Sequence, residues 1–114
     1  MKKSIIAQII VEGVHCWSNC TLDEVIYLKD LHRHQFNITA SAKVDHANRD
    51  IEFIQLGHKI KDHLHKRFWH EKLKLLHFGS MSCEMICEEI LAHFKELSFV
   101  EVWEDRENGA RVER

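Results

Sequence analysis

The chain has 114 residues, which fits a single domain over residues 1–114 with a buried core but little room for a deep cleft, so a site shared between subunits is expected. Its 16 basic and 18 acidic residues are mixed along the sequence and give a formal net charge of -2, which excludes the basic face that nucleic-acid phosphates require. No apolar run approaches the roughly 20 residues of a membrane-spanning helix, and the four cysteines accompany no secretory signal, so we expect a cytoplasmic protein with reduced thiols and no membrane contact.

The first part of the chain predicts two strands. Residues 4–11 are almost continuously apolar and rich in isoleucine, which is typical of a strand that is covered on both faces or that pairs at an interface. Residues 35–44 alternate strictly between apolar and polar side chains. This second segment is therefore the clearest strand in the sequence.

The second part predicts two helices and a closing hairpin. After Asp50, apolar side chains recur every three or four residues, as on one face of a helix. Ser82 suits the N-cap position of a second amphipathic helix, and we expect this helix to pack against the first. Residues 99–104 alternate again, and Asn108-Gly109 favours a hairpin turn into a short last strand. The order strand, strand, helix, helix, strand, strand predicts one α+β domain with two helices on an antiparallel sheet.

Three of the ten histidines form a candidate metal site. His32 and His34 lie two residues apart beside the clearest strand, so both rings leave the same face of the sheet. His15 follows the first strand, where a hairpin would bring it next to that pair. Three neutral imidazoles leave a fourth position open, as in catalytic zinc sites. Spacing alone leaves a chance His-x-His pattern in a histidine-rich chain as an open alternative, and His63 and His65 form such a pair in a helical segment where they cannot share a metal.

The cysteines offer a rival set of metal ligands. Cys16 and Cys20, with Cys83 and Cys87, have spacings that occur in structural zinc sites. Cys83 and Cys87 lie one helical turn apart beside the apolar stripe of the second predicted helix, and free cysteine is often buried as a small hydrophobic residue. We therefore expect these two cysteines to pack in the core.

An ordered set of segments across nearly the whole chain resembles the family of 6-pyruvoyl-tetrahydropterin and 6-carboxy-tetrahydropterin synthases. The segments are V-E-G-V-H-C-W, L-K-D-L-H-R-H-Q-F-N-I-T-A, D-I-E-F-I-Q-L, S-C-E-M-I-C-E-E-I and V-E-V-W-E-D-R-E-N-G-A. The resemblance implies the T-fold (tunnelling fold), an α+β fold with a four-stranded antiparallel sheet, two helices packed on one face and the order ββααββ, assembled as a homo-oligomer (trimer or hexamer). It also implies Zn²⁺ held by His15, His32 and His34, with Glu104 binding the edge of a pterin ring as substrate-binding residue.

The sequence departs from the family pattern at the positions of its proton-transfer groups. The family's cysteine, four residues before the His-x-His pair, corresponds to Leu28. The family's Asp-His pair after the first helix corresponds to Trp69-His70, so the candidate catalytic residue His70 lacks the aspartate that would orient it. Other groups in the loop between the zinc ligands remain open as replacements, namely Cys16, Cys20, Asp23 and Glu24.

The resemblance implies a zinc-dependent enzyme of pterin or deazapurine-precursor (queuosine) metabolism. Such an enzyme would be a lyase of the 6-pyruvoyl- or 6-carboxy-tetrahydropterin synthase type, acting on a dihydroneopterin triphosphate-like substrate. The alternative is a non-catalytic T-fold protein that binds a pterin or purine-like ligand at subunit interfaces. The enzyme is favoured because a complete set of metal ligands with an open position is more often kept for chemistry than for packing.

Overall fold

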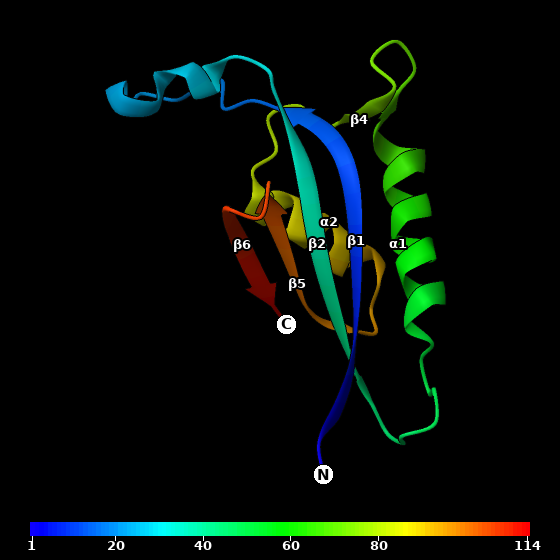
Figure 1. Cartoon of the computed structure of the whole chain (residues 1–114). Coiled ribbons are helices and arrows are strands. Elements are labelled where there is room, and N and C mark those ends of the chain that lie inside the picture. The colour runs from blue at the N-terminus through cyan, green and yellow to red at the C-terminus, as the bar shows by residue number, and fades with distance from the viewer.

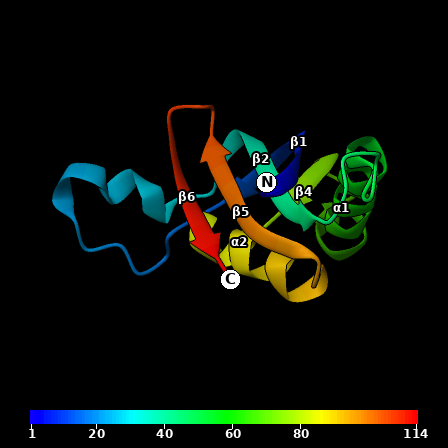
Figure 2. The same ribbon diagram turned by 90° about the horizontal axis from the view of Figure 1, so that it is seen from below.

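The computed structural model describes residues 1–114, which form two layers, a twisted sheet and two α-helices on one of its faces (Figures 1 and 2). The sheet has six strands, β1 (Lys3–His15), β2 (His32–Val44), β3 (Trp69–His70), β4 (Leu75–His77), β5 (Leu97–Glu104) and β6 (Asn108–Glu113). The helices are α1 (Phe53–Phe68), α2 (Cys83–His93) and a 3-10 helix, η1 (Asp23–Lys29), in the long connection between β1 and β2. No helix is both long and apolar enough to span a lipid bilayer.

The strand order is β3-β4-β1-β2-β5-β6, and a long hairpin of β1 and β2 forms its centre. These two strands pair antiparallel along their whole length, from Lys3 opposite Val44 to His15 opposite His32. β5 pairs antiparallel with β2, and β6 with β5. β4 pairs in parallel with the last part of β1, at Gly13 and its neighbour, which makes the sheet mixed.

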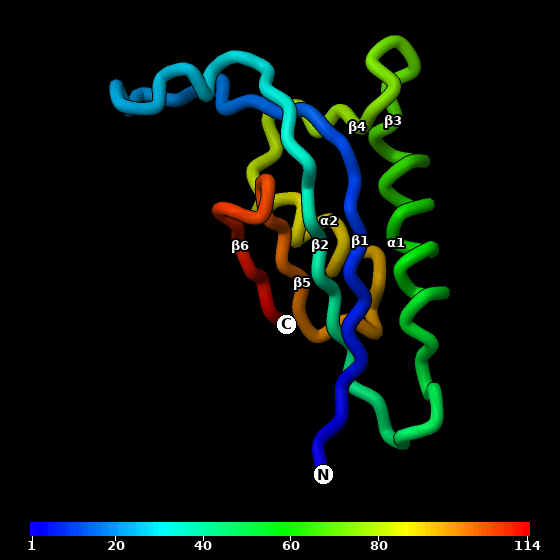
Figure 3. The backbone as a smooth tube through the Cα atoms, in the orientation of Figure 1, coloured from blue at the N-terminus to red at the C-terminus, as the bar shows by residue number.

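The predicted T-fold, with a four-stranded antiparallel sheet and two helices in the order ββααββ, is wrong. The sheet has six strands and is mixed, and the chain has three helices. β3 and β4 were missed because strands of 2 and 3 residues are too short to show a periodic pattern. η1 was missed because it buries no residue and so has no apolar stripe. Figure 3 shows β3 and β4 as a small hairpin between the end of α1 and the chain segment that leads to α2.

The long periodic elements were predicted correctly. Residues 4–11 and 35–44 lie within β1 and β2, and the apolar stripe after Asp50 belongs to α1. Ser82 is the N-cap of α2, and its hydroxyl accepts the backbone N–H of Met85 at 3.2 Å. At α1, Glu52 has this role, since its carboxylate accepts the N–H groups of the two residues that follow Phe53.

The last hairpin turns earlier than Asn108-Gly109 suggested. Asn108 and Gly109 already pair with β5, and the turn consists of the three preceding residues. Asp105 (φ 52°) and Arg106 (φ 61°) adopt the left-handed conformation, and the N–H of Glu107 donates to the carbonyl of residue 104. Asp105 tolerates this conformation because its carboxylate accepts hydrogen bonds from His34 and Gln35 of β2.

The core lies between the helices and the facing side of the sheet. Alternate residues of β1 and β2 point into it, together with one stripe of each α-helix. Its fully buried large side chains include Phe36, Ile38, Ile60, Leu64, Leu76, Ile86, Ile90, Leu97, Val100 and Val102. No helix covers the other face of the sheet, where Ile6, Ile10 and Trp103 are exposed.

Candidate metal centre

The long β1–β2 hairpin brings together the three histidines of the predicted triad. His15 ends β1, and His32 begins β2 directly opposite it. His34 leaves the same face as His32 because side chains alternate along a strand. One ring nitrogen from each histidine lies within 4.8 Å of the other two. The rings are inclined edge to face, with centroids 4.6–5.3 Å apart.

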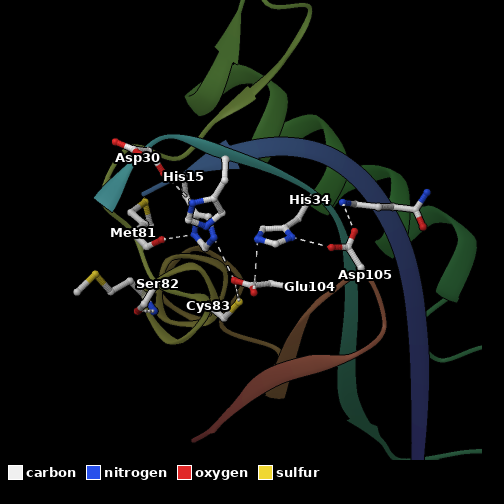
Figure 4. Close-up of polar contacts among 11 residues, drawn as sticks. His15, Asp30, His34, Met81, Ser82, Cys83, Glu104 and Asp105 are labelled. Carbon is white, nitrogen blue, oxygen red and sulfur yellow. Dashed lines mark hydrogen bonds and ion pairs between the residues drawn. The ribbon is translucent and has the colours of Figure 1, made fainter. Parts of the chain in front are cut away.

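Each of the three rings is held through its Nδ1 atom by an oxygen that can only accept a hydrogen bond. Nδ1 therefore carries the proton in the neutral ring, and Nε2 presents its lone pair. The contacts, of which Figure 4 shows those of His15 and His34, are His15 Nδ1 to the Met81 carbonyl at 2.8 Å, His32 Nδ1 to the Asp30 carbonyl at 2.8 Å, and His34 Nδ1 to Asp105 Oδ2 at 2.6 Å. Acceptors of this kind fix the tautomer and orientation of histidines that ligate metals.

The Nε2 atoms of His15 and His34 are buried and have no hydrogen-bond partner. Glu104 is their nearest charged neighbour, with Oε2 at 3.0 Å from His15 Nε2 and Oε1 at 3.5 Å from His34 Nε2. Burial lowers the pKa of His15, but the adjacent carboxylate and the Met81 carbonyl more than offset burial, so this pKa is raised above its ordinary value of 6.5. Contact with His15 in turn lowers the pKa of Glu104. A positive charge is thus favoured between these groups, whether it is a proton or a metal ion.

The donor set fits Zn²⁺. Nitrogen ligands lie about 2.0–2.1 Å from a four-coordinate zinc, so they stand about 3.3–3.4 Å from one another. The three nitrogens here lie within 4.8 Å of one another, so the group is of a size that can close on one ion. Neutral imidazoles with fixed Nδ1 protons, buried and beside a carboxylate, are a suitable environment for this cation.

A pocket of about 410 Å³ is lined by two of the three histidines, His15 and His32. Trp17 and Leu28, from the β1–β2 connection, form one side of it, and Ser82 and Cys83, at the start of α2, form another. Glu104 reaches it from the end of β5. The pocket therefore contains Leu28, at the position that corresponds to the family's cysteine, and the carboxylate expected to bind a ring.

The four cysteines do not form a metal-binding cluster, and the histidine triad is the group that the structure brings together. Cys83 and Cys87 are buried in the core, as predicted. Burial raises the pKa of Cys87 to about 12, and burial together with Glu104 raises that of Cys83 further. Cys20 is buried, with its thiol near the carbonyl of Val25, and Cys16 lines the pocket.

His70 does not line the pocket of its own chain. It lies in β3, with its ring centroid 5.6 Å from that of His77. Its Nδ1 accepts the backbone N–H of Leu73 at 3.2 Å, so the neutral ring carries its proton on Nε2. An aspartate partner would hold the opposite tautomer, but Trp69 stands in that place and donates instead to Glu71.

Asp105 is the site residue that sequence reasoning missed. One of its oxygens accepts the Nδ1–H of His34, and the other accepts the backbone N–H of Gln35 at 2.9 Å. These two contacts lower the pKa of the Asp105 carboxyl, with that to His34 the larger. In the sequence, Asp105 is marked only by its position next to Glu104. Its partner, His34, becomes evident only from the register in which Glu104 pairs with Phe36 on β2.

No protein-family model and no curated protein matches the chain. Among solved structures, the crystal structure of the uncharacterized protein WS1659 from Wolinella succinogenes is similar, with a TM-score of 0.65 and 12% sequence identity. The match covers 99% of this chain and 98% of that chain. The chain therefore shares its fold, over nearly its whole length, with a solved protein from Wolinella succinogenes.

Proposed function

We propose that the protein is a zinc-dependent enzyme of pterin metabolism, similar in activity to 6-pyruvoyl- and 6-carboxy-tetrahydropterin synthases, with a dihydroneopterin triphosphate-like substrate. The observation that carries the proposal is that one ring nitrogen from each of His15, His32 and His34 lies within 4.8 Å of the other two, beside a pocket of about 410 Å³. The metal assignment rests on this geometry. The choice of a pterin rests on the resemblance of the sequence segments.

The residues of the pocket have distinct tasks in this proposal. His15, His32 and His34 hold the metal, which when bound supplies a Lewis acid that polarises an oxygen of the substrate side chain. Glu104 accepts two adjacent N–H groups of a flat ring, a charge-assisted bidentate contact that fixes the ring's orientation. Trp17 and Leu28 offer apolar surface to the ring faces.

A second candidate, a protein that binds a pterin or purine-like ligand without converting it, is favoured by a specific observation. Leu28 lines the pocket where the family has a thiol, and His70 lies outside the pocket with its proton on Nε2. Neither side chain can take a proton from a ligand in this pocket. Incubation with dihydroneopterin triphosphate distinguishes the two candidates, because the enzyme releases a changed pterin, whereas the binding protein returns the compound intact.

The metal centre is tested by metal analysis of purified protein. We expect about one zinc per chain in the parent, and loss of most of it in His34→Ala, because two imidazoles bind zinc far more weakly than three. His58→Ala is the matched control, since His58 is exposed on α1 and should leave the zinc content unchanged. Full zinc occupancy in His34→Ala would refute the assignment.

We also propose that copies of the chain assemble into a trimer or hexamer. The sheet face with Ile6, Ile10 and Trp103 has no cover within the chain. Most of the β1 edge also lacks a strand partner, because β4 pairs with it only at Gly13 and Val14. Light scattering at micromolar concentration is the test, and a stable monomer would contradict the proposal.

A further inference from the structure

The carboxylate of Glu104 lies close to the Nε2 atoms of two of the three candidate metal ligands. Its Oε2 is 3.0 Å from His15 Nε2, and its Oε1 is 3.5 Å from His34 Nε2. Two ligands of one four-coordinate zinc stand about 3.3–3.6 Å apart, given zinc–nitrogen and zinc–oxygen bonds near 2.0–2.2 Å. The carboxylate thus already stands at ligand-to-ligand distance from two of the three histidines.

The hydrogen-bonding state of these atoms supports the same conclusion. Nδ1 of His15 and of His34 donates to a fixed acceptor, so each neutral ring has a lone pair at Nε2. An ionised carboxylate has lone pairs only, and neither Nε2 atom has a hydrogen bond. Lone pairs that face one another at 3.0–3.5 Å, in largely buried groups, require a proton or a metal ion between them, and a metal ion can satisfy both rings and the carboxylate at once.

We propose that Glu104 is the fourth protein ligand of the metal held by His15, His32 and His34. The resting centre would then have four protein ligands and no open position. This inference rests on the proposed metal centre and deepens it, because it gives Glu104 a place on the metal when the pocket holds no ring.

The surroundings of Glu104 keep its carboxylate at the centre. The residue pairs with Phe36 on β2, and Phe36 is two positions from His34 on the same strand. The next residue, Asp105, accepts hydrogen bonds from both His34 and Gln35, which hold the end of the β5 backbone against β2. The thiol of Cys83 donates to Oε2 at 3.5 Å, which leaves further lone pairs of the carboxylate for the metal.

The proposal makes ligand binding and opening of the centre one event. A flat heterocycle that pairs its N–H groups with Glu104 competes with the metal for the same two oxygens. When the ring draws the carboxylate away, a position beside His15 and His34 becomes free for another donor of the same ligand. A molecule without such N–H groups would leave the centre closed, so Glu104 would select ring ligands by controlling access to the metal.

The test compares metal binding by the parent, Glu104→Gln and Glu84→Gln. Glu84 lines the same pocket from α2 but is exposed and touches no histidine, so it serves as the matched control. Glutamine is a poor ligand in place of a carboxylate, so chelator competition should show zinc bound at least tenfold more weakly by Glu104→Gln, with Glu84→Gln unchanged. In the cobalt(II) form, the visible absorption bands should shift in Glu104→Gln alone. Added azide should change the spectrum of this variant but not that of the parent.

Equal zinc affinity and identical cobalt spectra in the parent and Glu104→Gln would overturn the inference. If His34→Ala still loses zinc in that case, the three-histidine centre stands without Glu104. Failure of the parent to bind metal would overturn both proposals. If Glu104→Gln does not fold, Glu104→Asp provides the same comparison, because the shorter side chain keeps its charge but withdraws the oxygens from the histidines.

Discussion

The contact between Asp105 and His34 gives the sharpest prediction about the proposed metal centre. Asp105 accepts the Nδ1–H of His34 at 2.6 Å and the N–H of Gln35 at 2.9 Å, so one carboxylate orients both the ligand ring and its strand. In Asp105→Asn, one of these two donors meets an amide NH₂ group, and the negative charge is lost. Asparagine is well tolerated in the left-handed conformation that residue 105 adopts, so the turn should be kept. The substitution therefore isolates the support of His34.

Loss of such a supporting contact typically lowers metal affinity about 10- to 100-fold, or about 1.4–2.7 kcal/mol. We expect a zinc dissociation constant larger by this factor for Asp105→Asn, measured by competition with a chromophoric chelator. Arg106→Asn is the control, since Arg106 is the neighbouring turn residue with positive φ and has no contact with the histidines. An affinity within twofold of the parent for Asp105→Asn would refute the idea that this carboxylate orients His34.

Two further predictions concern the scaffold. Gly13→Ala should lower the free energy of unfolding by about 1–3 kcal/mol, as measured in urea, because the new Cβ would lie 2.8 Å from a carbon of Phe78 and 3.0 Å from one of Phe36. A decrease of less than about 0.5 kcal/mol would mean that the two rings move aside freely. Two backbone N–H groups lower the pKa of the Glu52 carboxyl below 4.5. The stability that its charge contributes is therefore present above the unfolded-state pKa and is lost as pH falls through the folded-state pKa. The difference in unfolding free energy between the parent and Glu52→Gln should therefore shrink on acidification, and a difference that grows at low pH would contradict the capping role.

The long elements and the histidine triad could be predicted because their signals are local. Period two in residues 35–44 and the apolar stripe of α1 result directly from the geometry of a strand and a helix. The spacing of His32 and His34 places both rings on one face without knowledge of the rest of the fold. His15 required one further assumption, a hairpin, which the pairing of His15 with His32 confirms.

The remaining features depend on contacts between distant segments. β4 has 3 residues and is a strand only because the end of β1 provides a parallel partner. Asp105 and His34 are 71 positions apart, and only the register between β2 and β5 brings them together. The same contact overrides the turn preference of Asn108-Gly109, because it fixes Asp105 in the turn.

The composition of β1 has a consequence for how the hairpin finds its alignment. Ile5 and Ile9 face the helices, whereas Ile6 and Ile10 lie on the opposite face, so β1 shifted by one position would again bury isoleucines. The isoleucines alone therefore distinguish poorly between the two alignments. Ala7 and Val11 select the correct one, because a shift would bury Gln8 and Glu12 in their place. A shift would also turn His15 to the opposite face, away from His32 and His34. The proposed metal would add to this selection, since only the correct alignment gains the binding energy of three imidazoles on one ion.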